Sequence, residues 1–306
     1  MEVRLSGGDD RNLMERLLEK QIPLSNSCNG KGTCGKCKVR VVSGTITDVT
    51  DTERRLLTEK EVAGHMRLAC MTKARGEVVI ETGEGEEDHV FTTGGVEGHF
   101  ERDADKHGYG LAVDIGTTTV VATLVNMDDG TEGPTYAQIN PQKTYGLDVL
   151  TRITYETEYK EKAITQLQEA IVHGLNEAIK GICAEAGIDV TQIGEIDIAA
   201  NCTMLHMLAG VDARPIGRAP YKPAFTDGQK LKARDLGLMG ADDAMVYLLP
   251  SVSAYIGADI VAGVYVCDLR HSSGKTLFID IGTNGELVLE AGGKMYSCSC
   301  AAGPAL

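Results

Sequence analysis

The sequence predicts a small α+β domain at residues 1–82, an acidic flexible linker at residues 83–110, and an α/β domain at residues 111–306. Three observations support this fold class. Cysteine and basic residues concentrate in the first region, and the second holds almost nothing that a core could bury. In the third, apolar runs broken by glycine turns alternate with helical runs. A chain of 306 residues is long enough for this division.

The composition narrows the class of protein. The formal net charge is −14, which argues against a nucleic acid as the main partner. No apolar run approaches the ~18 residues that span a bilayer, and the N-terminus lacks the basic flank and apolar core of a signal peptide. We therefore expect a cytoplasmic protein without a membrane partner, whose nine cysteines serve thiolate or metal chemistry rather than disulfides.

The first domain is predicted to contain three strands and one helix. The helix covers Asn12–Lys20, where leucines at positions 13, 17 and 18 share one face and charged residues the other. The strands are predicted at residues 3–5, Lys38–Val42 and Glu77–Glu81.

The second domain is predicted to contain one long helix and several shorter elements. Apolar residues recur every three or four positions over Glu158–Ala186, and Gly187 is a natural stop. Further strands are predicted at Glu195–Ala200 and Val246–Pro250, and further helices at Thr203–Ala209 and Ala254–Cys267.

One internal repeat stands out in the second domain. LAVDIGT at Leu111–Thr117 and LFIDIGT at Leu277–Thr283 share five of seven residues at a spacing of 166. This match indicates a duplicated half-domain. Because far fewer residues follow the second copy than the first, we expect the chain to be a C-terminally truncated fragment.

Four cysteines in the first domain have the spacing of metal ligands. Three lie in one glycine-rich loop with the pattern C-x5-C-x2-C, and the fourth follows after 32 intervening residues. Four thiolates suit zinc or an iron–sulfur cluster, and the glycines let backbone N–H groups approach sulfide. Zinc ribbons pair two C-x2-C knuckles, whereas plant-type ferredoxins have three cysteine ligands in one loop and a distant fourth. A zinc site or a chance cluster is therefore the minor alternative. The predicted ligands are Cys28, Cys34, Cys37 and Cys70.

The segment CNGKGTCGKC, followed by RLAC, resembles the [2Fe–2S] ferredoxin family over residues 1–82. The resemblance implies a β-grasp fold with a [2Fe–2S] cluster under a surface loop. It also implies that a packed helix or turn over Met66–Leu68 positions the fourth ligand. The helix follows the first strand almost at once, so we expect the family's first hairpin to be reduced.

The repeated DIGT segments each lie at the end of an apolar strand. The first is followed by another strand, which predicts a hairpin, and neither a P-loop nor a GxGxxG fingerprint is present. A tight glycine turn brings N–H groups to phosphate oxygens, and the strand-end Asp114 or Asp280 can hold a hydrated Mg²⁺. The alternative is that D-x-G-T is only a common turn. The predicted phosphate-binding residues are Gly116, Thr117, Thr118 and Thr119 in one turn and Gly282, Thr283, Asn284, Gly285 and Glu286 in the other.

These turns resemble the phosphate motifs of the superfamily of actin, sugar kinases and heat-shock chaperone ATPases. The chain also contains the segments GLDVLTRI (Gly146–Ile153), NCTMLHMLAG (Asn201–Gly210), LPSVSAYIGADIVAG (Leu249–Gly263) and CSCAAGPA (Cys298–Ala305). Together with the two turns, these segments resemble one branch of the superfamily, the ferredoxin-fused ATPases that reductively activate corrinoid proteins. The resemblance implies an actin-like α/β ATPase domain that binds ATP and Mg²⁺. It also implies transfer of one electron from the cluster to a Co(II) corrinoid, which regenerates Co(I).

Three other functions remain open from the sequence. They are an activator of another low-potential enzyme, a ferredoxin-type electron carrier with a docking ATPase-like domain, and a sugar or acid kinase. The expected partners are a corrinoid protein or corrinoid-dependent methyltransferase and an electron donor.

Several other residues have ordinary interpretations. Asp259 is interpreted as either a phosphate-facing or a capping carboxylate, and His206 as a core or interface histidine rather than a corrinoid contact. The remaining cysteines are interpreted as structural, three of them in apolar settings: Cys183, Cys202, Cys267, Cys298 and Cys300.

Overall fold

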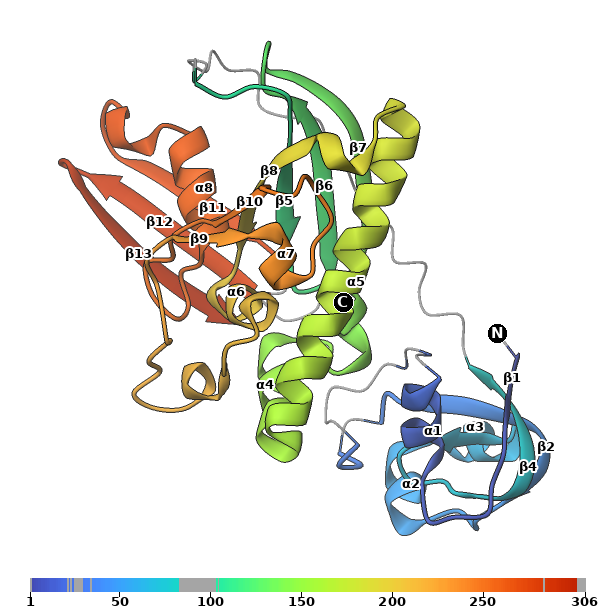
Figure 1. Ribbon diagram of the computed structural model, residues 1–306. Coiled ribbons are helices and arrows are strands. Elements are labelled where there is room, and N and C mark those ends of the chain that lie inside the picture. Colours follow the sequence, from blue (N-terminus) through green and yellow to red (C-terminus); the bar gives the residue numbers. More distant parts are fainter. Residues whose placement is uncertain are drawn as a thin grey trace. The chain divides into compact units, whose positions relative to one another are not determined.

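The computed structural model describes residues 2–20, 22, 24, 30–33, 35–82, 103, 105–282 and 284–301. The described residues form two compact units (Figure 1). One contains the N-terminal residues through Thr82 together with Gln142–Tyr155, and the other contains the remaining described residues. Most of the predicted linker, 83–110, lies outside the described residues. No helix in the described part of the chain combines the length and apolarity needed to cross a membrane.

The N-terminal unit is built on a four-stranded antiparallel sheet in the order β1-β4-β2-β3. β1 pairs directly with β4 and leads into the first helix, as expected for a reduced first hairpin. The predicted strands are confirmed. β2 and β4 extend beyond the predicted apolar segments, because the two strands continue to pair with each other there. The strands are β1 (Glu2–Leu5), β2 (Lys38–Ile46), β3 (Met66–Leu68) and β4 (Ala74–Thr82).

Helix α1 (Leu13–Glu19) confirms the predicted helix. The Asn12 side chain accepts from the backbone N–H of Glu15, whose carboxylate accepts from the Asn12 N–H, so two unpaired N–H groups at the helix start are satisfied. Leu13 and Leu17 are fully buried and anchor the core against the sheet.

Two short helices and a short strand were not predicted. α2 (Asp51–Leu56) and α3 (Glu59–Ala63) each begin with a capping box, Thr50 with Glu53 and Thr58 with Glu61. The expected helix or turn over Met66–Leu68 is wrong, because these residues form β3 and pair with β2. The backbone hydrogen bonds of this edge outweigh the weak local preference of three residues.

Glu53 is a buried carboxylate that holds the segment around Cys70. It accepts hydrogen bonds from the Arg67 guanidinium at 2.9 and 3.0 Å, from the Leu68 N–H at 3.0 Å and from the Thr72 hydroxyl at 3.0 Å. Burial by itself would raise its pKa, but the bonds from Arg67, Thr50 and Leu68 outweigh burial and lower the pKa to about 2. Leu68 and Thr72 flank Cys70, so Glu53 fixes both ends of that turn.

Replacing Glu53 by Ala is expected to destabilise the N-terminal unit by about 3–5 kcal/mol, because the Arg67 charge would remain buried without its partner. The loss can be followed as earlier unfolding of this unit in urea. Since the folded pKa is depressed, the stabilisation is complete above pH 4.5 and is lost as the pH falls through about 2. Glu61→Ala is the control: it removes a half-buried carboxylate that caps α3 and pairs with Lys38, and it should cost only about 1 kcal/mol. Equal effects of the two substitutions would contradict the prediction.

The larger unit contains a six-stranded sheet in the order β7-β6-β5-β8-β10-β9. β8 pairs in parallel with β5 on one side and β10 on the other, and the remaining pairs are antiparallel. Helix α5 lies against β6 and β7 (Figure 1). The strands are β5 (Tyr109–Ile115), β6 (Thr119–Asn126), β7 (Thr131–Ile139), β8 (Ile193–Ala200), β9 (Gln229–Lys232) and β10 (Met245–Leu248).

The long predicted helix is interrupted at its start. α4 (Val149–Tyr159) ends before Lys160, whose φ of 53° lies in the left-handed region, and α5 (Glu161–Ala186) begins after it. The expected start at Glu158 is therefore wrong, since a helix cannot continue through that backbone angle. The predicted end is confirmed, because Gly187 closes α5 with a φ of 69°. The other helices are α6 (Cys202–Ala209), α7 (Ala233–Leu236) and α8 (Ala258–Val266), with short 3-10 turns at Pro141–Thr144, Val190–Gln192, Arg214–Gly217 and Leu269–His271.

A second, three-stranded antiparallel sheet is formed by β11 (Thr276–Ile281), β12 (Asn284–Ala291) and β13 (Lys294–Ala301). Helix α8 packs on it: a Cβ at Gly263 would lie 2.5 Å from the Phe278 ring, so only glycine permits this close approach. α8 starts later than predicted, at Ala258 instead of Ala254. Gly257 precedes it with extended backbone and lies so close to Asn201 that a Cβ would clash.

Glu156, on α4, is a buried carboxylate with one bonded oxygen. Its Oε2 accepts from the Ala213 N–H at 3.0 Å, whereas no described residue bonds to Oε1. Burial raises the pKa of Glu156 to about 7, the Ala213 bond opposes this shift, and the nearby Asp212 charge adds to it.

Glu156→Gln is expected to stabilise the protein at pH 8 by about 2–3 kcal/mol and to change little at pH 4. The folded pKa is raised, so the wild-type protein loses stability as the pH rises from 4.5 through about 7, and a neutral amide avoids this loss. The measurement is the urea unfolding midpoint of both proteins across this range. A difference between the proteins that does not grow with pH would contradict the prediction.

Candidate functional site

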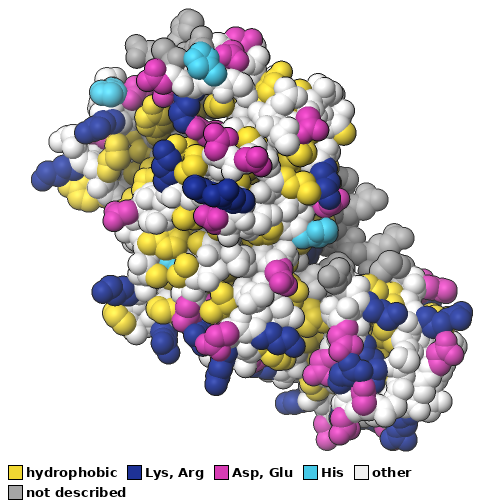
Figure 2. All heavy atoms as spheres, viewed as in Figure 1, with side chains coloured by type: hydrophobic (Ala, Val, Ile, Leu, Met, Phe, Trp, Pro, Cys, Tyr) yellow, Lys and Arg dark blue, Asp and Glu magenta, His cyan; other side chains and the backbone are white. Residues whose placement is uncertain are grey.

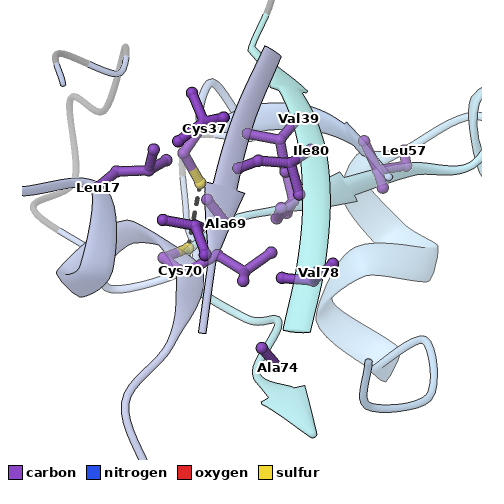
Figure 3. Packing of buried hydrophobic residues seen from close by; sticks show 13 residues of the cluster. Leu17, Cys37, Val39, Leu57, Ala69, Cys70, Ala74, Val78 and Ile80 are labelled. Atoms are coloured by element: carbon purple, nitrogen blue, oxygen red, sulfur yellow. Dashed lines mark hydrogen bonds between the residues drawn. The ribbon is translucent and has the colours of Figure 1, made fainter. Parts of the chain in front are cut away.

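Two of the four predicted cluster ligands lie side by side in the N-terminal unit (Figure 3). Cys37 immediately precedes β2, and Cys70 follows β3. The pairing of Lys38 with Leu68, and the bond from the Ala69 N–H to the Cys37 carbonyl, bring the two thiols together. Their sulfurs are 3.3 Å apart, and both side chains are buried. Cys28 and Cys34 lie outside the described residues.

The described part of the cysteine loop has a backbone that requires glycine. Gly30, Gly32 and Gly35 have φ angles of 79°, 69° and 68°, in the left-handed region. A Cβ on Gly30 would clash with Met14 and come within 3.9 Å of the Cys70 Cβ. At Gly30 the loop therefore lies close to Met14 and near the Cys70 turn.

The observed sulfur pair fits a metal centre. Two thiolates in a tetrahedral site, with bonds of about 2.3 Å, lie about 3.8 Å apart. Cys37 and Cys70 need only a small outward movement to ligate one metal atom. Within the described ranges no group of three or more His, Cys, Asp or Glu forms a metal site, and two of the predicted ligands fall outside those ranges.

The first DIGT turn connects β5 to β6, which confirms the predicted hairpin. A Cβ on Gly116 would lie 2.7 Å from the Thr119 carbonyl, so the tight turn demands glycine. Asn140 holds the turn from one side: its side-chain N–H donates to the Gly116 carbonyl at 2.8 Å and its backbone N–H to the Thr118 carbonyl at 2.7 Å. Thr117 is buried and Thr118 is exposed.

Asn201 holds the same turn from the other side. Its side-chain N–H donates to the Thr117 hydroxyl at 3.1 Å, and its carbonyl oxygen caps α6 by accepting from the Met204 N–H at 3.0 Å. The sequence motifs predicted no role for Asn201 or Asn140. An asparagine before an apolar helical run is a capping signal and points to Asn201, but Asn140 has no local signal.

The second DIGT turn connects β11 to β12 and places Asp280 opposite Glu286 in the ladder. The Gly282 N–H donates to the Asn284 carbonyl at 2.9 Å, and the Ser299 hydroxyl donates to Glu286 at 2.9 Å. Gly285 is buried. Thr283 lies outside the described residues.

Carboxylates from both turns and from α8 influence one another. Asp114 is accessible to solvent, yet desolvation raises its pKa to about 6, and the charges of Asp259 and Asp280 add to the shift. Desolvation also raises the pKa of Asp259, Asp280 and Glu286, and the Asp280 charge adds to the shifts of Asp259 and Glu286. The two turns therefore face a common acidic region, which favours a cation with its own water shell, as Mg²⁺ usually keeps.

His206 is a core residue, as expected. Its Nδ1–H donates to the Cys202 carbonyl at 2.7 Å, which leaves Nε2 to accept from the Ala224 N–H at 3.0 Å. Cys183 and Cys202 are buried, whereas Cys267 is exposed, so the apolar setting expected for it is wrong. Its place at the end of α8 turns it to solvent. Cys298 and Cys300 are exposed on β13.

The fold and the matched domains define a class of protein: an N-terminal [2Fe–2S] ferredoxin-type domain followed by an actin-like domain of the ASKHA type. Residues 2–75 match the 2Fe-2S iron-sulfur cluster binding domain. Residues 109–272 match the RACo middle region, and residues 274–306 match the C-terminal domain of RACo, the ASKHA domain. The chain belongs to the RACo family.

Individual relatives agree with this family. The chain is 34% identical to the corrinoid activation enzyme RamQ of Eubacterium limosum over 202 residues, 66% of this chain and 34% of that protein. It is 22% identical to the Co(II) methylated amine-specific corrinoid protein reductase of Methanosarcina barkeri, over 65% of this chain and 37% of that protein. A solved reductive activator for corrinoid, iron-sulfur protein matches with a TM-score of 0.62 at 28% identity, over 98% of this chain and 62% of that one.

The chain spans about a third of the length of the curated relatives it matches. The predicted fold class, a ferredoxin domain followed by an actin-like domain, is confirmed by the family models and by the solved relative.

Proposed function

We propose that this chain takes part in ATP-dependent reductive activation of a corrinoid protein. One electron passes from the ferredoxin-type domain to Co(II) corrinoid, which becomes Co(I), and an external low-potential donor replaces the electron. The observation that carries the proposal is the combination, in one chain, of a buried cysteine pair in a 2Fe-2S domain and two acidic hairpin turns in a RACo region. The names of the relatives point to corrinoid proteins as the partner.

The cysteines would hold the cluster. Cys37 and Cys70 enter from β2 and β3, and Cys28 and Cys34 complete the predicted set of four thiolates. When bound, a [2Fe–2S] cluster supplies one electron at a time. The protein's part is to bury the Cys37 and Cys70 sulfurs and to hold the turn around Cys70, through the hydrogen bonds that Glu53 accepts from Leu68 and Thr72.

The two hairpin turns would hold the phosphates of ATP. Backbone N–H groups and hydroxyls at the first turn would donate to phosphate oxygens, with Asn140 and Asn201 keeping the turn in shape. Asp114 and Asp280 would orient a hydrated Mg²⁺. Its positive charge would offset the desolvation that raises both pKa values and the repulsion from Asp259 and Asp280 that adds to the shift of Asp114. Moving one electron uphill costs ~2.3 kcal/mol per 100 mV, so a gap of a few hundred mV requires a source such as a nucleotide. The proposed binding residues are Gly116, Thr117, Thr118 and Thr119 in the first turn and Gly282, Thr283, Asn284, Gly285 and Glu286 in the second.

The test is anaerobic reduction of a Co(II) corrinoid protein by the full-length protein with a low-potential donor. We expect the Co(I) absorption band to develop with Mg-ATP and to stay absent with ADP. Equal reduction with either nucleotide would instead identify an electron carrier with a docking domain. ATP turnover without reduction of any corrinoid protein would point to another low-potential enzyme as the partner.

A further inference from the structure

We propose that the described loop residues 30–33 and 35–36, together with helix α2, form a basic electron-exchange face that docks an acidic protein surface. The inference rests on the proposed electron transfer and adds the chemistry of the partner. Lys31 and Lys36 lie in the loop between the ligand positions, and both are exposed. Whatever approaches the cysteine pair through this loop meets positive charge first.

The charge pattern along the chain is uneven at this place. The whole chain carries a net charge of −14, yet no acidic residue occurs between Glu19 and Asp48. The stretch that contains three of the four predicted ligands therefore has a charge opposite to that of the protein. Its five basic residues are Lys20, Lys31, Lys36, Lys38 and Arg40.

Two of these bases are already neutralised. Lys38 forms an ion pair with Glu61, and Arg40 forms one with Glu81. Lys36 has no ion pair among the described residues. Lys36 is exposed, so its charge faces a partner in the loop itself.

Helix α2 adds to the same face. A Cβ on Gly32 would lie 3.2 Å from the Thr52 methyl, and one on Gly35 would lie 3.4 Å from the Leu56 Cβ, so α2 packs on the loop. Arg54 and Arg55 are exposed in its last turn, and Glu53 is buried in the ion pair with Arg67. The loop and α2 together expose four bases, Lys31, Lys36, Arg54 and Arg55, against one acid, Asp51.

The composition of this domain favours a protein over other polyanions. Residues 1–82 contain no Phe, Tyr or Trp, so the domain offers no aromatic platform for nucleic-acid bases and no aromatic anchor for a lipid surface. The face of the molecule in Figure 2 shows acidic and basic side chains intermingled. An acidic patch around the partner's redox centre would be attracted to the basic face and oriented with the two centres together.

Two inorganic oxidants of opposite charge test the face without ATP or a corrinoid. Hexacyanoferrate(III), an anion, and hexaamminecobalt(III), a cation, each accept one electron from the reduced cluster. We expect the rate with the anion to fall as salt is added and the rate with the cation to rise. The net charge of −14 would produce the reverse.

The double substitution Lys31→Glu and Lys36→Glu should slow the anionic oxidant about 10-fold at low salt and invert its salt dependence. Arg4→Glu is the control: Arg4 is exposed on β1, at the opposite edge of the sheet from β3. The control should change the rate less than 2-fold. The proposal would be overturned if the rate with the anionic oxidant rose with salt, as the net charge predicts. It would also be overturned if the double variant and Arg4→Glu changed that rate equally.

A structural readout accompanies the kinetics. Carbodiimide joins lysine amines to carboxylates in contact, and flavodoxin is an acidic one-electron carrier. We expect the joined peptides, identified by mass spectrometry, to contain Lys31 or Lys36. Joining at other lysines, or tighter binding to phosphatidylserine vesicles or single-stranded DNA than to flavodoxin, would overturn the proposal. A failure here would leave ATP-dependent corrinoid reduction intact, because neither experiment contains nucleotide or corrinoid.

Discussion

Replacing Cys70 by Ala is expected to remove nearly all visible absorption of the [2Fe–2S] cluster from the purified protein. Cys70 lies 3.3 Å from Cys37, and the two sulfurs are held together by the β2–β3 pairing. Loss of one thiolate leaves an iron without its ligand, and no other described cysteine lies beside the pair to replace it. The measurement is the visible spectrum together with acid-labile sulfide and iron content.

Cys183→Ala is the matched control for this experiment. Cys183 is also buried, but it lies in α5, in the other unit of the chain. Burial raises the pKa of its thiol, which disfavours the thiolate that a metal requires. The control should keep the cluster. If the purified wild-type protein held zinc and no sulfide, the electron-transfer proposal would fail.

Asp114→Asn should reduce ATP turnover of the full-length protein at least 100-fold while leaving the cluster spectrum unchanged. Removing this carboxylate removes a proposed orienting group for Mg²⁺, and loss of one such electrostatic contact commonly costs about 10²–10³ in rate. The spectrum should persist because the cysteine pair belongs to the other unit. Turnover is measured as phosphate release, and full turnover in the variant would mean that the DIGT turn is only structural.

Protein stability separates this effect from misfolding. The folded pKa of Asp114 is raised from 3.8 to about 6, so its charge destabilises the fold progressively as the pH rises through that window. Asp114→Asn should therefore be more stable than the wild-type protein at pH 7, even though it is inactive. Asp197→Asn is the control. Asp197 lies on β8, next to β5, and desolvation and the Glu195 charge raise its pKa to about 6. No carboxylate of the two turns contributes to that shift. This control should keep full turnover.

Local sequence signals determined much of the fold. Asn12 starts α1 and Gly187 ends α5 because capping depends on nearby residues and on a glycine's access to the left-handed region. Both DIGT segments form hairpins, because an apolar run, a glycine turn and a second apolar run need only neighbouring residues to pair. The spacing of the cysteines was likewise sufficient to predict a ferredoxin-type domain.

The tertiary structure decided which distant groups meet. Cys37 and Cys70 are 33 positions apart and touch because β2 pairs with β3. β3 has only three residues and is too short to be predicted from them. Asn140 and Asn201 lock the first turn from separate elements. Asp259 joins Asp114 and Asp280 through the packing of α8. Such meetings depend on sheet order and on close packing across the whole domain, and periodicity along the chain carries information only about neighbours in sequence.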